Sequence, residues 1–524
     1  MLYSATEKES LTCPTEVTSP VLVRGRWLIP GGDSLADAVA DGAVVVGDGV
    51  VREVGPWVEL RERHPDAETL GSAQHAVLPG LINAHHHSSG LSGVQQGISD
   101  LPLESWLLTL ARRRRVDPYL ATILTSARLL RAGVTSVVDV YSAHGTPDDV
   151  ATAARQAISA YDEAGVRVAF AMGMTEQSHL VWGDDERFLT ELPRDLRRLA
   201  QRLVPQETDL GGEDYFSIFD ELRSEIQNRS RISLWFAPPG PQWCSDATWV
   251  RIAEAAERYD TRIQTHLLES IFEKQFGARA YGRPTVLHLQ ELGVLGPRIS
   301  FAHGVWLTEP EIEALAASGA SVSHNPSSNL RLRAGIAPLM AMLSRGLNVG
   351  LGLDANALND DDDMLTEMRM ALRLHRSPRP DDVAPTPADV FGMATWRGAR
   401  LLGDTRLGRI APGYAADLVL LRLDNVTWPW IAPESDPLEL LVCRASSRDV
   451  DTVLVDGEVV LRDGSTTRFD AAAAGRELHA ALSATAFPED EAALVARLLP
   501  AVEAYYRSWE LDEHDPFITY NSRC

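Results

Sequence analysis

The chain has 524 residues, of which 45% are hydrophobic and 23% are charged, the composition of a globular protein with a large core. Its formal net charge of −24 argues against nucleic acid or an anionic membrane as a partner, because both attract positively charged surfaces. No stretch reaches the roughly 18 consecutive apolar residues that a membrane span needs, and the start, MLYSATEKES, lacks the basic and apolar regions of a secretory signal. We therefore expect a cytoplasmic protein.

Strand-rich segments lie near both ends of the chain. Residues 20–58 contain VLVRGRWLI and GAVVVGDGVVREVG, in which Gly-Asp-Gly marks a tight turn. Residues 406–463 repeat the pattern in LGRIAPGYAADLVLLRL and VDTVLVDGEVVLRDG. Because these segments flank one long middle section, we expect them to form a small β-sandwich assembled from both chain ends.

The middle section alternates short apolar runs with amphipathic segments of helical period, the pattern of parallel β/α units. Eight such runs predict an α/β fold of the (β/α)8 TIM-barrel type. A doubly wound sheet stays open as the alternative, because strand order cannot be read from one sequence. The predicted strands are residues 76–86, 134–140, 166–172, 232–238, 262–267, 298–303, 320–325 and 347–354.

Two further segments are longer than a barrel and a sandwich alone require. Residues 175–230 are long and charged, and we expect them to lie over the mouth of the barrel. The last part of the chain has helix-like periodicity up to Trp509. We therefore predict that residues 1–75 form the first part of the sandwich and residues 76–400 the barrel. Residues 401–466 form the second part of the sandwich, and residues 467–524 form a helical tail.

The strongest local signal is PGLINAHHHSSG, in which His85 and His87 end the first predicted strand. Side chains two apart on a strand point the same way, so these imidazoles can bind one ion together, whereas His86 faces the opposite side. A titratable residue closes three later strands as well: His266, His303 and Asp354. Such groups are costly at the ends of buried strands unless they are paired or ligated, and strand ends meet at one rim of a barrel. The pattern predicts a metal centre.

These residues stand in motifs that resemble the amidohydrolase superfamily, and more narrowly its cytosine-deaminase-like or ATZ/TRZ (atrazine chlorohydrolase-like) branch. The resemblance spans residues 20–465, and its motifs are PGLINAHHH, GVTSVVD, QTHLLES, FAHGVWL, SHNPSSNLRLRAGIAPL, VGLGLD and GRIAPGYAADLVLL. It implies a TIM-like barrel with a flanking β-sandwich and one catalytic divalent ion, either zinc or iron. The implied metal ligands are His85, His87, His266 and Asp354.

The resemblance also implies roles in catalysis. Glu269 matches the family's proton-shuttling glutamate, and His303 matches the histidine that contacts the reacting group. Asp354 can in addition accept a proton from water, whose pKa a divalent ion lowers from about 15.7 towards about 7. The fourth predicted strand ends in Ala-Pro-Pro, with no lysine that could be carbamylated to bridge two metals, which favours a single ion.

We therefore expect a hydrolase of C–N bonds, an aminohydrolase that releases ammonia or an amine from a small N-heterocycle or a guanidine-like compound. The alternative is a cyclic-amide or other amidohydrolase, or a dechlorinase, using the same site. A nucleoside substrate is disfavoured, because Pro239 and the ARRRR run (residues 111–115) stand where nucleoside-specific relatives carry a histidine and an acidic residue. We expect the run itself to be a solvated helix face, and the protein to be a homodimer.

Other features have simpler interpretations. VGLGLDA (residues 349–355) fits a dinucleotide fingerprint, but the acidic NALNDDDDM that follows would repel phosphate. A catalytically inactive binding protein on the same barrel would be expected to lose Glu269 or Asp354, and this chain has both. We expect His324 to order a loop, and the acidic run at 360–363 to mark a helix start, where the helix dipole favours anions.

Overall fold

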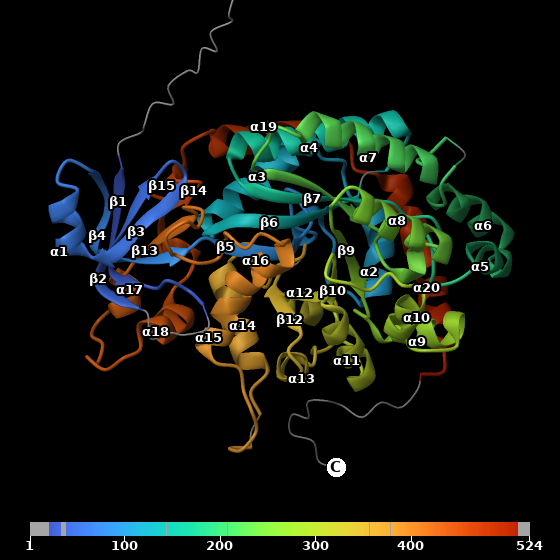
Figure 1. The fold of residues 1–524 in the computed structure, drawn as a ribbon. Coiled ribbons are helices and arrows are strands. Elements are labelled where there is room, and N and C mark those ends of the chain that lie inside the picture. Colours follow the sequence, from blue (N-terminus) through green and yellow to red (C-terminus); the bar gives the residue numbers. More distant parts are fainter. Residues whose placement is uncertain are drawn as a thin grey trace, which may run out of the picture.

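The computed structural model describes residues 20–32, 38–142, 144–206, 208–355, 357–377 and 379–511. Two eight-stranded sheets organise the described part of the chain. Figure 1 shows a small β domain at one side of the molecule, next to a barrel that helices surround. No helix in the described ranges has the length and apolar character needed to cross a membrane.

The second sheet is the predicted barrel. All its strand pairs are parallel, and they follow one another in the order of the sequence. A parallel bridge between His86 and Asp354 brings the first strand next to the end of the last. The strands are β5 (Leu81–His86), β6 (Val134–Tyr141), β7 (Arg167–Gly173), β8 (Ile232–Ala237), β9 (Ile263–Leu267), β10 (Ile299–His303), β11 (Ser321–His324) and β12 (Asn348–Leu351).

Helices alternate with these strands, and their ends carry local signals. Thr308, the predicted cap, donates its backbone N–H and its hydroxyl to the carboxylate of Glu311 at the start of α11. The helices between the strands and after β12 are α2 (Leu103–Thr109), α3 (Pro118–Arg131), α4 (Pro147–Ala164), α7 (Gly212–Ile226), α8 (Asp246–Arg258), α9 (Ile271–Tyr281), α10 (Thr285–Glu291), α11 (Glu309–Ser318), α12 (Pro326–Arg331), α13 (Leu339–Ser344), α14 (Met364–Leu374), α15 (Pro387–Met393) and α16 (Trp396–Leu402).

The first sheet is the β-sandwich, and both ends of the chain build it, as predicted. Its strand order is β16-β15-β14-β13-β4-β1-β2-β3. The strands are β1 (Val21–Leu28), β2 (Val39–Gly47), β3 (Val50–Pro56), β4 (Glu68–Pro79), β13 (Leu418–Arg422), β14 (Val450–Val455), β15 (Glu458–Arg462) and β16 (Ser465–Thr466), with the short helices α1 (Trp57–Arg63), α17 (Asp424–Thr427) and α18 (Pro437–Arg444) beside them.

The junction between the two sheets corrects one strand prediction. The apolar run at 76–86 is two strands, because β4 ends at Pro79 in the sandwich and β5 starts at Leu81 in the barrel. Gly80 separates them, and a Cβ atom there would stand 2.1 Å from the Thr135 Oγ1 atom. The chain passes so close to β6 at this point that a side chain would clash.

A separate apolar cluster lies outside the main core of the barrel. It joins α5 (Asp185–Glu191), α6 (Arg194–Ala200) and Phe276 of α9 to the C-terminal helix α20 (Glu489–Arg507). Figure 1 places α5, α6 and α20 on the side of the barrel away from the β-sandwich. Within the segment 175–230, α5 and α6 belong to this cluster, whereas α7 packs Phe219 against Phe236 of β8 as an ordinary barrel helix. The remaining helix, α19 (Ala471–Ala484), lies against α3.

Candidate metal centre

Four side chains converge at the carboxyl ends of the barrel strands. The Nε2 atoms of His87 and His266 are 3.2 Å apart. The Asp354 Oδ1 atom lies 3.5 Å from the Nε2 atom of His85 and 3.4 Å from that of His87. Within the described residues, His85 with His87 and His266, and His85 with His303 and Asp354, form groups whose ligand atoms all lie within 4.8 Å of one another.

In each of the three proposed histidine ligands, the Nδ1 atom faces an oxygen of the protein. The Nδ1 atom of His85 lies 2.9 Å from the side-chain Oε1 atom of Gln264. The Nδ1 atoms of His87 and His266 lie 2.7 and 2.6 Å from the backbone oxygens of Val140 and Pro239. Because these oxygens accept hydrogen bonds, each Nδ1 carries the proton and each Nε2 presents its lone pair to the centre.

This arrangement fits a cation. Two lone pairs that face each other across 3.2 Å repel, and the Nε2 atom of His85 is buried without a hydrogen-bond partner among the described residues. A divalent ion between the nitrogens and the Asp354 carboxylate would satisfy all of them. Imidazole nitrogen and carboxylate oxygen are ligands that zinc prefers.

Burial keeps the histidines in the form that can bind a metal. Burial, followed by the charge of His85, lowers the pKa of His87 and of His266 to about 3. Burial alone would raise the pKa of Asp354, but the neighbouring imidazoles, His85 first, hold it well below its usual value. The imidazoles of His87 and His266 are therefore neutral and the Asp354 carboxylate is ionised near neutral pH.

Several contacts fix the Asp354 carboxylate and backbone. The Ser328 hydroxyl donates to the Oδ2 atom at 2.5 Å, which leaves Oδ1 towards the histidines. The Nδ1 atom of His86 lies 2.7 Å from the backbone oxygen of Asp354. Asp354 and His303 adopt φ angles of 55° and 75°, in the left-handed region that non-glycine residues rarely occupy. Such strain is concentrated at functional sites.

Glu269 and His303 lie beside the cluster. The Glu269 Oε2 atom is 3.5 Å from the His303 Nε2 atom, and its Oε1 atom is buried without a partner among the described residues. Burial, followed by the charge of Asp354, raises the pKa of Glu269 well above its usual value. Asn329 Oδ1 lies 2.9 Å from the His303 Nδ1 atom and orients the ring. A buried carboxyl whose protonated form is favoured therefore stands next to an oriented imidazole.

An aromatic wall borders the site. The ring of Trp243 lies 6.5 Å from that of His266, centroid to centroid, and packs edge-to-face on Trp182 at 4.7 Å. The Nε1 atom of Trp182 donates to Glu104 at 3.2 Å, and Glu104 also accepts from the hydroxyl of Ser270, the neighbour of Glu269.

The structure thus brings the predicted site residues His85, His87, His266, Glu269, His303 and Asp354 together. Two other predicted polar features have the simpler roles that we expected. His324 pairs with His375, their Nε2 atoms 2.9 Å apart. Asp363 caps α14 by accepting from the backbone N–H groups of Leu365 and Thr366.

Sequence reasoning missed part of the support and misjudged the arginine run. Gln264, Ser328 and Asn329 were not singled out, although the last two stand in the SHNPSSN motif. The ARRRR run is not a solvated helix face, because Arg112, Arg113 and Arg114 are half-buried and only Arg115 is exposed. Burial lowers the pKa of Arg113 to about 10.

Comparison with known sequences gives a consistent result. Residues 76–460 match the profile described as "Amidohydrolase family", and residues 42–67 match an "Imidazolonepropionase-like composite domain, bacteria". A 5'-deoxyadenosine deaminase of Methanothermobacter thermautotrophicus is 36% identical over 445 residues, which cover 83% of this chain and 93% of that protein. An 8-oxoguanine deaminase of Pseudomonas aeruginosa is 33% identical, with 86% and 97% covered.

Solved structures share the fold. An adenosine deaminase from Xanthomonas campestris with bound zinc superposes with a TM-score of 0.75 at 28% identity, covering 88% of this chain and 98% of that one. Atrazine chlorohydrolase from Arthrobacter aurescens, complexed with zinc, superposes with a TM-score of 0.74 at 23% identity, covering 88% and 99%. The second similarity is informative about the fold alone.

Proposed function

Because the chain belongs to the amidohydrolase family and its curated relatives are deaminases, it is a metal-dependent aminohydrolase, and we propose that it removes an amino group from a small nitrogen heterocycle. One observation carries this proposal. Three histidines present bare Nε2 atoms to a buried carboxylate, and a protonated glutamate stands next to them.

The proposed metal site holds one zinc ion, bound by His85, His87, His266 and Asp354. Its donor set matches zinc chemistry, and β8 ends in Ala237-Pro238-Pro239 with no lysine to bridge a second ion. When bound, such an ion supplies Lewis acidity that lowers the pKa of water to about 7.

Side chains of the protein would then accept and donate the protons of the reaction. Asp354, held by Ser328 through one oxygen, accepts a proton from the attacking water at its other oxygen. Glu269, whose protonated form is favoured, delivers its proton to the ring nitrogen. The proton held by Asp354 then passes to the departing nitrogen, and Glu269 regains a proton from the new hydroxyl group as the C–N bond breaks. His303, oriented by Asn329, contacts the reacting group. In the overall reaction water adds to an amidine-like carbon, a C–O bond forms, the C–N bond breaks and ammonia leaves.

We propose a free heterocycle rather than a nucleoside as the substrate. The relatives include enzymes named for both classes, 8-oxoguanine and 5'-deoxyadenosine. In this chain Pro239 stands where nucleoside-specific relatives have a histidine, and its backbone oxygen accepts a hydrogen bond from the Nδ1 atom of His266. The residues that follow α2 are arginines, where those relatives have a carboxylate. The aromatic wall of Trp182 and Trp243 suits a planar ring.

The test is an ammonia-release screen of the zinc-loaded protein over purines, pterins, triazines, pyrimidines and guanidino compounds. The variant Glu269→Gln should keep its zinc content and lose about 10²–10⁴-fold in turnover, the usual contribution of general acid–base catalysis. Unchanged turnover in that variant would refute the role of Glu269. Hydrolysis of cyclic amides without ammonia release from any of these compounds would replace the proposed reaction with ring opening.

A further inference from the structure

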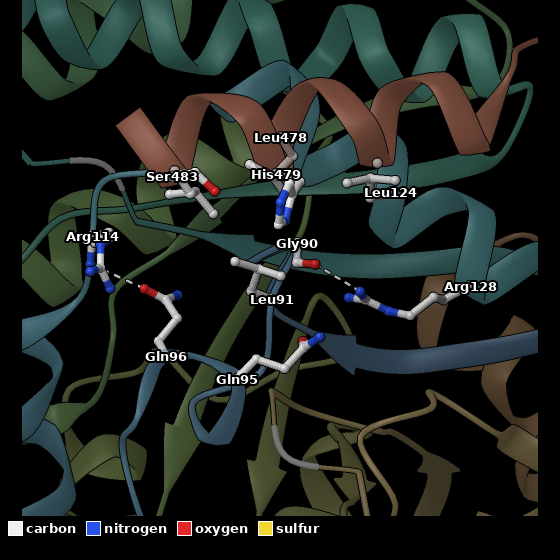
Figure 2. A pocket seen from close by; sticks show the side chains of 12 residues that line it. Gly90, Leu91, Gln95, Gln96, Arg114, Leu124, Arg128, Leu478, His479 and Ser483 are labelled. Carbon is white, nitrogen blue, oxygen red and sulfur yellow. Dashed lines mark hydrogen bonds between the residues drawn. The ribbon is translucent and has the colours of Figure 1, made fainter. Parts of the chain in front are cut away.

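A second cavity lies outside the metal centre, between α3, α19 and the loop that follows β5. Its volume is about 630 Å³, within the range of sites for small organic ligands. The lining residues are Gly90, Leu91, Gln95, Gln96, Arg114, Leu124, Arg128, Gly475, Leu478, His479, Leu482 and Ser483. Figure 2 shows Arg114 and Arg128 at opposite ends, with His479 pointing from α19 into the space between them.

The charged side chains that line this cavity are all basic. It contains two arginines, a histidine, two glutamines and a serine, but no carboxylate among the described residues that form it. The chain as a whole has 73 acidic residues against 49 lysines and arginines. A cavity with only positive and neutral polar groups is therefore unusual for this surface and would attract anions.

The two arginines of the cavity differ in their partners. Arg128 is neutralised, because its Nε atom lies 2.7 Å from the Asp362 Oδ2 atom, and it also donates to the backbone oxygen of Gly90 at 2.8 Å. The Arg114 guanidinium forms no ion pair with a described residue, and its Nε atom is buried without a hydrogen-bond partner. The guanidinium carbon lies over the Phe487 ring, 5.2 Å from its centroid.

The neighbours of Arg114 strengthen the positive charge. The Nε atoms of Arg112 and Arg113 are likewise buried without a partner in the described part of the chain. An arginine taken out of water without a counter-ion is costly. A guanidinium that lies over a ring and is free at its N–H edge is suited to bind a carboxylate or phosphate through two parallel hydrogen bonds.

We propose that this cavity binds a small organic anion, whose carboxylate or phosphate group pairs with the Arg114 guanidinium while His479 and the glutamines contact the rest of the molecule. The ligand would lie against Gly90 and Leu91, three and four residues beyond His87. The site is separate from the metal centre, and the proposal does not depend on which reaction the metal centre catalyses.

The test uses the zinc-loaded full chain and isothermal titration calorimetry. The probes are inorganic phosphate and malonate, with malonamide as the uncharged counterpart of malonate. We expect both anions to bind and malonamide to bind at least about tenfold more weakly, because charge-assisted hydrogen bonds are the stronger ones. Arg114→Gln should weaken the binding of both anions roughly 10- to 100-fold, and His479→Gln should weaken it by a smaller factor.

Arg115→Gln is the matched control, because it removes the same charge from an exposed neighbour that does not line the cavity. Its dissociation constants should stay within about twofold of the wild type, as expected of an exposed charge. Unaltered thermal unfolding without anion would show that each variant is folded. The proposal is overturned if neither anion binds, or if Arg114→Gln binds both as tightly as the wild type, since the anion would then lie at the zinc ion or on the general surface.

Discussion

The hydrogen bond from Ser328 to Asp354 offers a direct test of the metal assignment. Ser328 is completely buried, and its hydroxyl lies 2.5 Å from the Asp354 Oδ2 atom. The other carboxylate oxygen faces the Nε2 atoms of His85 and His87 at 3.5 and 3.4 Å. The substitution Ser328→Ala removes one donor and leaves a buried carboxylate oxygen without it.

The size of the effect follows from the kind of bond. A hydrogen bond to a charged group contributes about 1.5–3 kcal/mol, and about 1.4 kcal/mol corresponds to a factor of ten. We therefore expect Ser328→Ala to bind zinc roughly 10- to 100-fold more weakly, the range found when the support of a metal ligand is removed. Competition between the metal-free protein and a chromophoric chelator measures this dissociation constant directly.

The adjacent Ser327 provides the control. It is equally buried, but its hydroxyl and backbone N–H donate to Glu367 rather than to Asp354. Ser327→Ala therefore removes the same atom from the same turn without touching the proposed ligand, and its zinc affinity should match the wild type. The reasoning fails if Ser328→Ala binds zinc normally, or if the two variants lose affinity equally.

Three further outcomes are expected. Asn329→Leu should lower kcat about tenfold or more with unchanged zinc content, because the His303 ring loses the acceptor of its Nδ1 proton; steady-state kinetics and metal analysis check this. Chelation of the metal should lower the free energy of unfolding by about 4 kcal/mol relative to zinc at about 1,000 times its Kd, as read by calorimetry, and zinc should restore it. Burial raises the pKa of Glu367 from 4.5 to about 7, so between these pH values the folded protein holds a proton that the unfolded chain releases. The stabilisation of the fold by this proton is complete below pH 4.5 and is lost as the pH rises through 7. The unfolding free energy of the wild type relative to Glu367→Gln should accordingly fall by about 3 kcal/mol between pH 4.5 and 8 in urea titrations; a constant difference would contradict the buried titration.

The barrel strands could be predicted from the sequence because each is a short apolar run bounded by polar residues. The predicted strand at 134–140 and the observed Val134–Tyr141 differ by one residue, and the prediction at 298–303 differs from Ile299–His303 likewise by one. The run at 76–86 was different, since apolarity continues through Gly80 while the chain changes sheets. Hydrophobic pattern shows that a residue is buried but not which sheet it joins.

The site residues could be predicted for a related reason, since polar residues at strand ends are rare and meet at one rim. The groups that hold these side chains in place could not be predicted. The acceptors for the Nδ1 atoms of His87 and His266 are backbone oxygens of Val140 and Pro239, and any residue type supplies such an oxygen. The burial of Arg112 to Arg114 was missed because it depends on packing against the C-terminal part of the chain, which no local pattern encodes.

The proposed metal centre also lies where the barrel closes. His85 and His87 belong to the first strand and its end, and Asp354 follows the last strand, so the proposed ligands come from both sides of the seam. The backbone joins them at the same place, because the N–H groups of Leu353 and Asp354 donate to the His85 oxygen at 3.2 and 3.0 Å. Only a bridge, rather than a full ladder, connects β5 to this segment. An ion bound across the seam would therefore add cross-links where only a bridge joins the strands, which is why we expect metal removal to affect the stability of the whole barrel as well as its activity.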